Sequence, residues 1–291
     1  MPNKGDPADR AGLSLAASCG VPSAPPPAGV FGRPRATTTH VQQRGTKMSP
    51  AKRLIKASFN FIGLNVSRLP RDPSSVSRFE QLYLKYKDST MLGREGYMTN
   101  LALAATVRTP GCVIECGVWK GGTSAGMAEV LGPDREYFLF DSFQGHVDPQ
   151  PIDGPAALAW QADKSGPWYF NNAVVGPEDA DAAMKKSGAK NYRLVKGWFE
   201  DSLATFTPPS PIAVLRIDCD WHAPTTTCLR ALFPYVADDG ILIADGYPDW
   251  DGYARALHEY LAGYAGIARI KQFEGSLYYV VKGARKWEFT T

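Results

Sequence analysis

The chain has 291 residues, a formal net charge of +3, and 44% hydrophobic against 21% charged residues. This is the composition of an ordinary globular protein. The small net charge and the scattered lysines and arginines argue against a nucleic-acid partner, and no apolar run approaches the roughly 18 residues that cross a bilayer. The five cysteines form no C-x-x-C pair, so we expect free thiols, no membrane partner and a reducing, cytoplasmic location.

The N-terminal part divides into two segments. Residues 1–47 are rich in proline, glycine, alanine, serine and threonine and lack apolar periodicity, which predicts a disordered extension. Residues 48–74 contain spaced apolar positions with basic neighbours and predict a short helical segment. That helix could cap the fold, touch a membrane surface, or form the subunit contact of a homo-oligomer. The remaining domain is predicted over residues 75–285.

A helical pattern over residues 75–109 is followed by short β-rich runs that alternate with longer helical patterns. The strand candidates are residues 112–116, 136–141, 192–197, 212–218 and 241–245. Apolar strands that alternate with helices are typical of a parallel sheet with helices on both faces. At the end, ARIKQF and SLYYVVKG are joined by a short turn and predict an antiparallel hairpin. A mostly parallel α/β sheet ending in a hairpin is the seven-stranded, Rossmann-like fold of S-adenosylmethionine (SAM)-dependent methyltransferases.

Four of the five predicted strands end in an acid: Glu115, Asp141, Asp218 and Asp245. In open α/β sheets, ligands bind at the carboxyl ends of the strands. Carboxylates gathered there raise each other's pKa unless a cation separates them. The sequence therefore predicts a positive charge at this rim, and a sulfonium, an ammonium and a divalent metal are all open answers.

The stretch VIECGVWKGGTS carries the first part of the predicted site. A pyrophosphate loop reads G-x-G-x-x-G without a preceding acid, whereas here Glu115 precedes the glycines and suits the cationic amino group of SAM. Asp141 follows the glycines by about twenty residues, where a carboxylate takes the ribose hydroxyls of an adenosyl group. Thr123 and Ser124 open the next predicted helix and can cap it. Together with the hairpin, this pattern predicts SAM binding.

The second part of the site lies in LRIDCDWHAPTTT and ILIADGY. Asp218, Asp220 and Asp245 converge if their strands are neighbours, and hard oxygen ligands of this kind suit Mg²⁺. A bound cation lowers the pKa of an alcohol, and a carboxylate outside the metal shell can then take its proton. His222 is an alternative base. His146 and His258 carry less expectation of a chemical role.

Six segments, in order, resemble the macrocin O-methyltransferase family over roughly residues 75–283: TMLGREGYMTNL, IECGVWKGGTS, LFDSFQG, VKGWFEDSL, LRIDCDW and IADGY. Members of that family are SAM- and Mg²⁺-dependent enzymes that methylate sugar hydroxyls in antibiotics and related natural products. The resemblance implies a methyltransferase domain over residues 75–285. It also implies a small-molecule hydroxyl acceptor, most readily a sugar of a glycosylated natural product.

The resemblance implies roles for individual residues. Asp220 would be the general base, and Asp218 and Asp245 would bind the metal. With the residues argued above, the predicted cofactor-binding set is Thr90, Met91, Glu115, Cys116, Gly117, Val118, Trp119, Thr123, Ser124, Asp141, Ser142, Phe143, Gly197, Trp198 and Asp218.

The chain departs from the family pattern at two positions. The family usually has a second aspartate after the position of Asp245, where this chain has Gly246, and a tyrosine two residues after the base, where this chain has His222. One predicted metal ligand is therefore missing, and water, Asp249, Asp251 or His222 would have to replace it. The alternatives are a metal-independent methyltransferase that uses His222 as base, and a catalytically degenerate fold that binds SAM without turnover.

Overall fold

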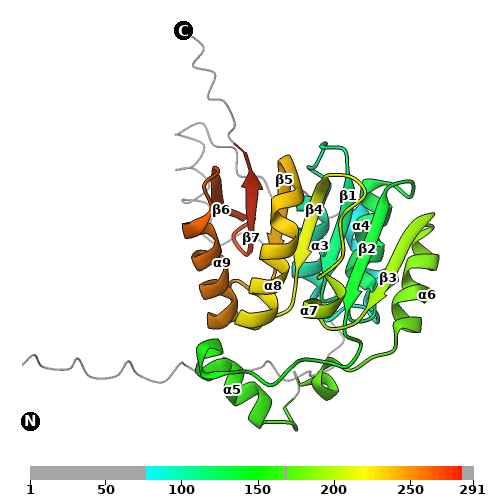
Figure 1. Cartoon of the computed structure of the whole chain (residues 1–291). Helices are drawn as coiled ribbons and strands as arrows, with labels where there is room; N and C mark the ends of the chain where they lie inside the picture. The colour runs from blue at the N-terminus through cyan, green and yellow to red at the C-terminus, as the bar shows by residue number, and fades with distance from the viewer. Residues whose placement is uncertain (1–76, 167–168, 284–291) are drawn as a thin grey trace, which may run out of the picture. The chain divides into compact units, whose positions relative to one another are not determined.

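A computed structural model of the chain describes residues 77–166 and 169–283 (Figure 1). The predicted disordered extension over residues 1–47 and the predicted helical segment over residues 48–74 lie outside these residues, and the domain bounds 75–285 stay a prediction. Within the described part of the chain, no helix is both long enough and apolar enough to cross a membrane.

The described residues form one seven-stranded sheet with strand order β3-β2-β1-β4-β5-β7-β6. The first five strands pair in parallel, and β7 runs antiparallel to both β5 and β6. The strands are β1 (Cys112–Cys116), β2 (Glu136–Asp141), β3 (Asn191–Lys196), β4 (Ile212–Ile217), β5 (Val236–Ala244), β6 (Ala268–Phe273) and β7 (Leu277–Lys282). The predicted fold class, a mostly parallel sheet that ends in an antiparallel hairpin, is confirmed. The central strands β1 and β4 are buried along their whole length, because helices cover both faces of the sheet.

Each face of the sheet has its own hydrophobic core. Leu101, Met127 and Met184 belong to one core, and Leu229 and Leu257 belong to the other. On the first face lie α2 (Arg78–Tyr86), α3 (Arg94–Ala104), α4 (Gly122–Leu131) and α6 (Pro177–Ser187); on the second lie α7 (Phe199–Ser202), α8 (His222–Leu232) and α9 (Asp251–Gly263). The helix α5 (Gly154–Ala162) lies beyond one end of the sheet rather than on either face (Figure 1). The short 3-10 helices are η1 (Pro151–Asp153), η2 (Phe170–Ala173) and η3 (Phe233–Tyr235).

The structure differs from the sequence prediction in four places. The helix predicted over residues 75–109 is two helices, α2 and α3, separated by a turn that brings Thr90 to the end of the sheet. The strand β5 begins at Val236, five residues before the predicted run, and α5 was not predicted. The capping role expected of Thr123 and Ser124 is wrong, because α4 begins at Gly122 and its N-cap, Gly121, makes no side-chain capping hydrogen bond.

Candidate active site

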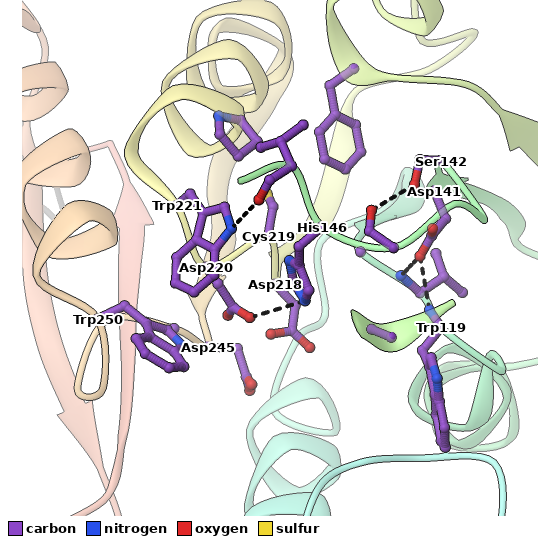
Figure 2. Close-up of a pocket in the computed structure, with 18 of the residues that line it drawn as sticks. Trp119, Asp141, Ser142, His146, Asp218, Cys219, Asp220, Trp221, Asp245 and Trp250 are labelled. Carbon is purple, nitrogen blue, oxygen red and sulfur yellow. Dashed lines mark hydrogen bonds and ion pairs between the residues drawn. The ribbon is translucent and has the colours of Figure 1, made fainter. Parts of the chain in front are cut away.

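A cavity of about 860 Å³ lies at the carboxyl ends of the parallel strands (Figure 2). It contains the four strand-end acids that the sequence singled out, Glu115, Asp141, Asp218 and Asp245. Most of the other predicted site residues also line it: Thr90, Met91, Gly117, Val118, Trp119, Thr123, Ser142, Gly197, Trp198 and Asp220. The structure therefore brings these side chains to one rim of the sheet.

Three predicted cofactor-binding residues lie behind the cavity wall. Cys116 is fully buried in the core under α8 and α9, and Phe143 is buried in the opposite core. The Ser124 hydroxyl donates a hydrogen bond to the Glu115 carboxylate. These residues would influence a bound cofactor through their neighbours, and direct contact with it stays a prediction.

Arg216 supplies the positive charge at the centre of the acids. Its side chain is 1% exposed, its guanidinium pairs with Glu115, and its Nη2 lies 2.9 Å from both Asp218 Oδ2 and Asp245 Oδ1. Arg216 Nε also donates to Asn100 Oδ1 over 3.1 Å. Arg216 was not among the predicted site residues, although its spacing in the sequence carries a signal. Arg216 lies two residues before Asp218, so both side chains point to the same face of the strand.

Glu115 is therefore already paired within the chain. Burial raises the pKa of its carboxyl, and the Arg216 charge acts against that shift. Its side chain is 1% exposed, whereas 30% of the Asp218 side chain is exposed. Of these two acids, Asp218 offers the more accessible negative charge to a ligand in the cavity.

Asp141 fixes the glycine-containing loop. Its Oδ2 accepts the backbone N–H groups of Val118 and Trp119 over 2.7 and 2.9 Å, and its Oδ1 accepts that of Phe143 over 2.7 Å. A carboxylate has about four acceptor positions, so one remains for a ligand hydroxyl. Gly117 has a φ of +84°, and a Cβ there would overlap the Asp218 carbonyl oxygen, so the loop requires glycine at this position.

Asp220 lies on the opposite side of the cavity, at the start of α8. Its φ of +62° is unusual for a non-glycine residue and carries a conformational cost. Burial raises the pKa of its carboxyl, and the Asp245 and Asp249 charges raise it further, while His146 and Arg216 act against the shift. A raised pKa makes this carboxylate a stronger base than an ordinary aspartate.

The two candidate histidines are placed differently. His146 lines the cavity, and its Nε2 is 3.5 Å from Asp220 Oδ2 (Figure 2). His222 is not part of the lining, and its Nε2 lies 2.9 Å from Glu259 Oε2 on α9. The alternative in which His222 acts as the base therefore finds no support in this geometry, whereas His146, which the sequence gave little weight, lies beside the predicted base.

Aromatic side chains form the wall next to Asp220, which we call the aromatic wall: Trp160, Tyr169, Trp221 and Trp250. The rings of Trp160 and Trp221 meet edge to face at 5.7 Å, and those of Trp221 and Trp250 at 5.0 Å. Trp160 comes from α5 and Trp250 precedes α9. The wall is thus assembled from segments that are far apart in the sequence.

The donor groups do not make up a complete divalent-cation site. One oxygen of Asp218 and one of Asp245 are already paired with Arg216, and Gly246 offers no side-chain donor. A Cβ on Gly246 would lie 2.9 Å from the Tyr253 ring and 3.3 Å from Asp220 Oδ1, so an acid there would displace its neighbours. Among residues 77–166 and 169–283, no group of three histidine, cysteine, aspartate or glutamate side chains is arranged to hold a metal ion.

Comparison with known proteins gives consistent matches. The family model described as macrocin-O-methyltransferase matches residues 76–272. The chain is 31% identical over 175 residues to 8-demethyl-8-(2,3-dimethoxy-alpha-L-rhamnosyl)-tetracenomycin-C 4'-O-methyltransferase of Streptomyces olivaceus, covering 57% of this chain and 64% of that protein. It is 32% identical over 164 residues to demethyldecarbamoylnovobiocin O-methyltransferase of Streptomyces niveus, covering 53% and 59%. The chain thus spans less than two thirds of the length of these curated relatives.

Two solved structures share the fold. The O-methyltransferase NovP matches with a TM-score of 0.56 and 24% identity over 67% of this chain and 83% of that one. The calicheamicin methyltransferase CalS11 matches with a TM-score of 0.50 and 20% identity over 85% of this chain and 100% of that one.

Proposed function

Because this chain belongs to the macrocin-O-methyltransferase family, we propose that it is a SAM-dependent O-methyltransferase whose acceptor is a small-molecule hydroxyl, a sugar unit of a glycosylated natural product. The two curated relatives are named as O-methyltransferases of a tetracenomycin and a novobiocin compound. The observation that carries the proposal is one cavity in which the Glu115–Trp119 loop and Asp141 face Asp220 across a row of acids.

The half of the cavity at β1 and β2 suits the methyl donor. SAM, when bound, would supply a methyl group on a positively charged sulfur. The remaining acceptor position of Asp141 takes a ribose hydroxyl, and Asp218 attracts the ammonium group. Thr90 and Met91, from the turn between α2 and α3, and Gly197 and Trp198, after β3, enclose the same half.

The half at β4 and β5 suits the acceptor. Asp220 takes the proton from the acceptor hydroxyl, so that the oxygen attacks the methyl carbon, and its raised pKa fits it for that role. The flat rings of the aromatic wall pack against the apolar face of a sugar ring. Holding the two reactants together at a fixed angle supplies much of the rate. The family resemblance implies that Asp218 and Asp245 would hold magnesium and that the metal would polarise the acceptor, but one oxygen of each is paired with Arg216 and the donor set is incomplete.

The test uses the full chain with labelled SAM and a panel of glycosylated acceptors. We expect SAM binding by calorimetry, methyl transfer to a sugar hydroxyl, and a loss of about 10²- to 10⁴-fold in kcat for Asp220→Asn, with SAM affinity retained. The matched control is Asp239→Asn, an exposed residue of β5 with a similar positive φ, which should leave turnover unchanged. The proposal fails if SAM does not bind, or if Asp220→Asn turns over as well as the unmodified protein.

A further inference from the structure

The Asp220 carboxylate is flanked by two features that differ in kind. Its Oδ2 faces His146 Nε2 at 3.5 Å. Its Oδ1 lies 3.3 Å from where a Cβ on Gly246 would be, so the glycine leaves that oxygen uncovered. A backbone held at a φ of +62° for a non-glycine residue persists only where the surroundings determine it strongly. The orientation of the carboxylate is therefore fixed: Oδ2 contacts His146, and Oδ1 faces the space next to Gly246.

His146 is itself fixed by contacts from three other segments. Its backbone N–H donates to the Asn172 carbonyl over 3.2 Å, and Asn172 Nδ2 donates to the His146 carbonyl over 3.0 Å. Trp221 Nε1 donates to the carbonyl of the adjacent Val147 over 2.9 Å (Figure 2). The imidazole packs edge to face on Trp160 at 5.5 Å and against Trp221 at 5.4 Å. Contacts with η2, α5 and the residue before α8 therefore fix the position of the His146 side chain before any ligand binds.

The charges around Asp220 point the same way. Asp245 and Asp249 both act on Asp220 as like charges, and the Arg216 guanidinium is taken up by Glu115, Asp218 and Asp245. Within the described part of the chain, the Asp220 carboxylate forms its ion pair with His146. The contact is long for a hydrogen bond, and catalytic contacts of this kind tighten when substrate fills a site.

We propose that His146 is a positioning residue for Asp220, holding Oδ2 so that Oδ1, the oxygen above Gly246, faces the acceptor hydroxyl. The inference rests on the proposed function. With its proton on Nε2, the imidazole donates to Oδ2. The acceptor proton then moves to Oδ1, the acceptor oxygen forms the new C–O bond, and the electrons of the breaking C–S bond go to sulfur.

Two substitutions separate the donor from the ring. His146→Phe keeps an aromatic ring between Trp160 and Trp221 but removes the N–H, whereas His146→Gln keeps an N–H at similar reach but removes the ring. We expect His146→Phe to lower kcat by about 100-fold, the cost of a misplaced catalytic group, with KM for the acceptor and the SAM dissociation constant nearly unchanged. We expect His146→Gln to recover most of kcat. Full activity in His146→Phe, or equal loss in both variants, overturns the inference.

A double-mutant cycle tests whether His146 acts through Asp220. If His146 acts through Asp220, then adding His146→Phe to Asp220→Asn costs no further residual turnover. If the double variant instead loses turnover by the product of the two single-variant losses, His146 has a separate structural role and the inference is overturned. An inactive Asp220→Asn with a fully active His146→Phe refutes the role of His146 alone, while an active Asp220→Asn refutes the proposed base itself.

Discussion

The half of the cavity at β1 and β2 and the half at β4, β5 and α5 are built by different means. In the first, Asp141 is bound by three backbone N–H groups of the adjacent loops, so the shape of the site depends on main chain. In the second, Asp220, His146 and Trp160 are held by side chains from distant segments. A main-chain site tolerates many neighbouring sequences, whereas a side-chain site can be altered by single substitutions. The half at β1 and β2, which we propose binds the methyl donor, therefore depends less on individual neighbouring side chains than the half at β4, β5 and α5.

The largest expected effect is on the residue that joins the two halves. Arg216→Met would leave Glu115, Asp218 and Asp245 without their shared counter-ion, and breaking a buried ion pair typically costs about 3–5 kcal/mol. We expect a loss of this size in the free energy of unfolding, measured with urea. The exposed Arg255 on α9, replaced in the same way, is the control and should change stability little. A stable Arg216→Met protein would mean that the halves are not coupled through this charge.

The next effect tests the main-chain half alone. Asp141→Ala removes the acceptor of three backbone N–H groups, and losing charge-assisted hydrogen bonds costs about 1.5–3 kcal/mol. We expect SAM to bind about 10- to 100-fold more weakly by calorimetry, with kcat at saturating SAM close to that of the unmodified protein. A large drop in kcat with unchanged SAM affinity would contradict the division between the halves.

A smaller effect tests the side-chain half. Trp160→Leu removes a ring of the aromatic wall, and aromatic contacts of this kind are worth about 0.5–1.5 kcal/mol. We expect KM for the acceptor to rise several-fold while SAM affinity is retained. Trp198→Leu, which lines the donor half, should do the reverse. Identical kinetics for the two variants would show that the cavity is not divided in this way.

The smallest effect is expected from removing divalent cations. Because Gly246 supplies no donor and Arg216 already occupies oxygens of Asp218 and Asp245, we expect saturating chelator to leave turnover essentially unchanged. Methyl transfer is measured with and without chelator, and after MgCl₂ is added back. Activity that collapses in chelator and returns with Mg²⁺ would show that the acids rearrange around a cation after all.

The residues at the ends of the parallel strands, Asp141 and Asp220 among them, were predicted to line a site because they lie within short motifs, where apolar runs and glycines mark the positions locally. Arg216 was readable too, since its spacing from Asp218 places both on one strand face, yet it was overlooked. His146, Trp160 and Trp250 could not be found this way. Their neighbours come from η2, α5, α8 and the segment before α9, and such long-range packing leaves no local pattern.

The left-handed backbone at Asp220 lowers folding stability at the same position where we propose the catalytic base. Glycine would adopt this conformation without the cost of roughly 1–3 kcal/mol that a side chain incurs in a sparsely populated region. A protein that only bound a ligand would have a higher free energy of unfolding with glycine at this position. An aspartate with a positive φ at this position is therefore what we expect in an active enzyme. In a relative that binds ligand without turnover, we expect glycine at the same position.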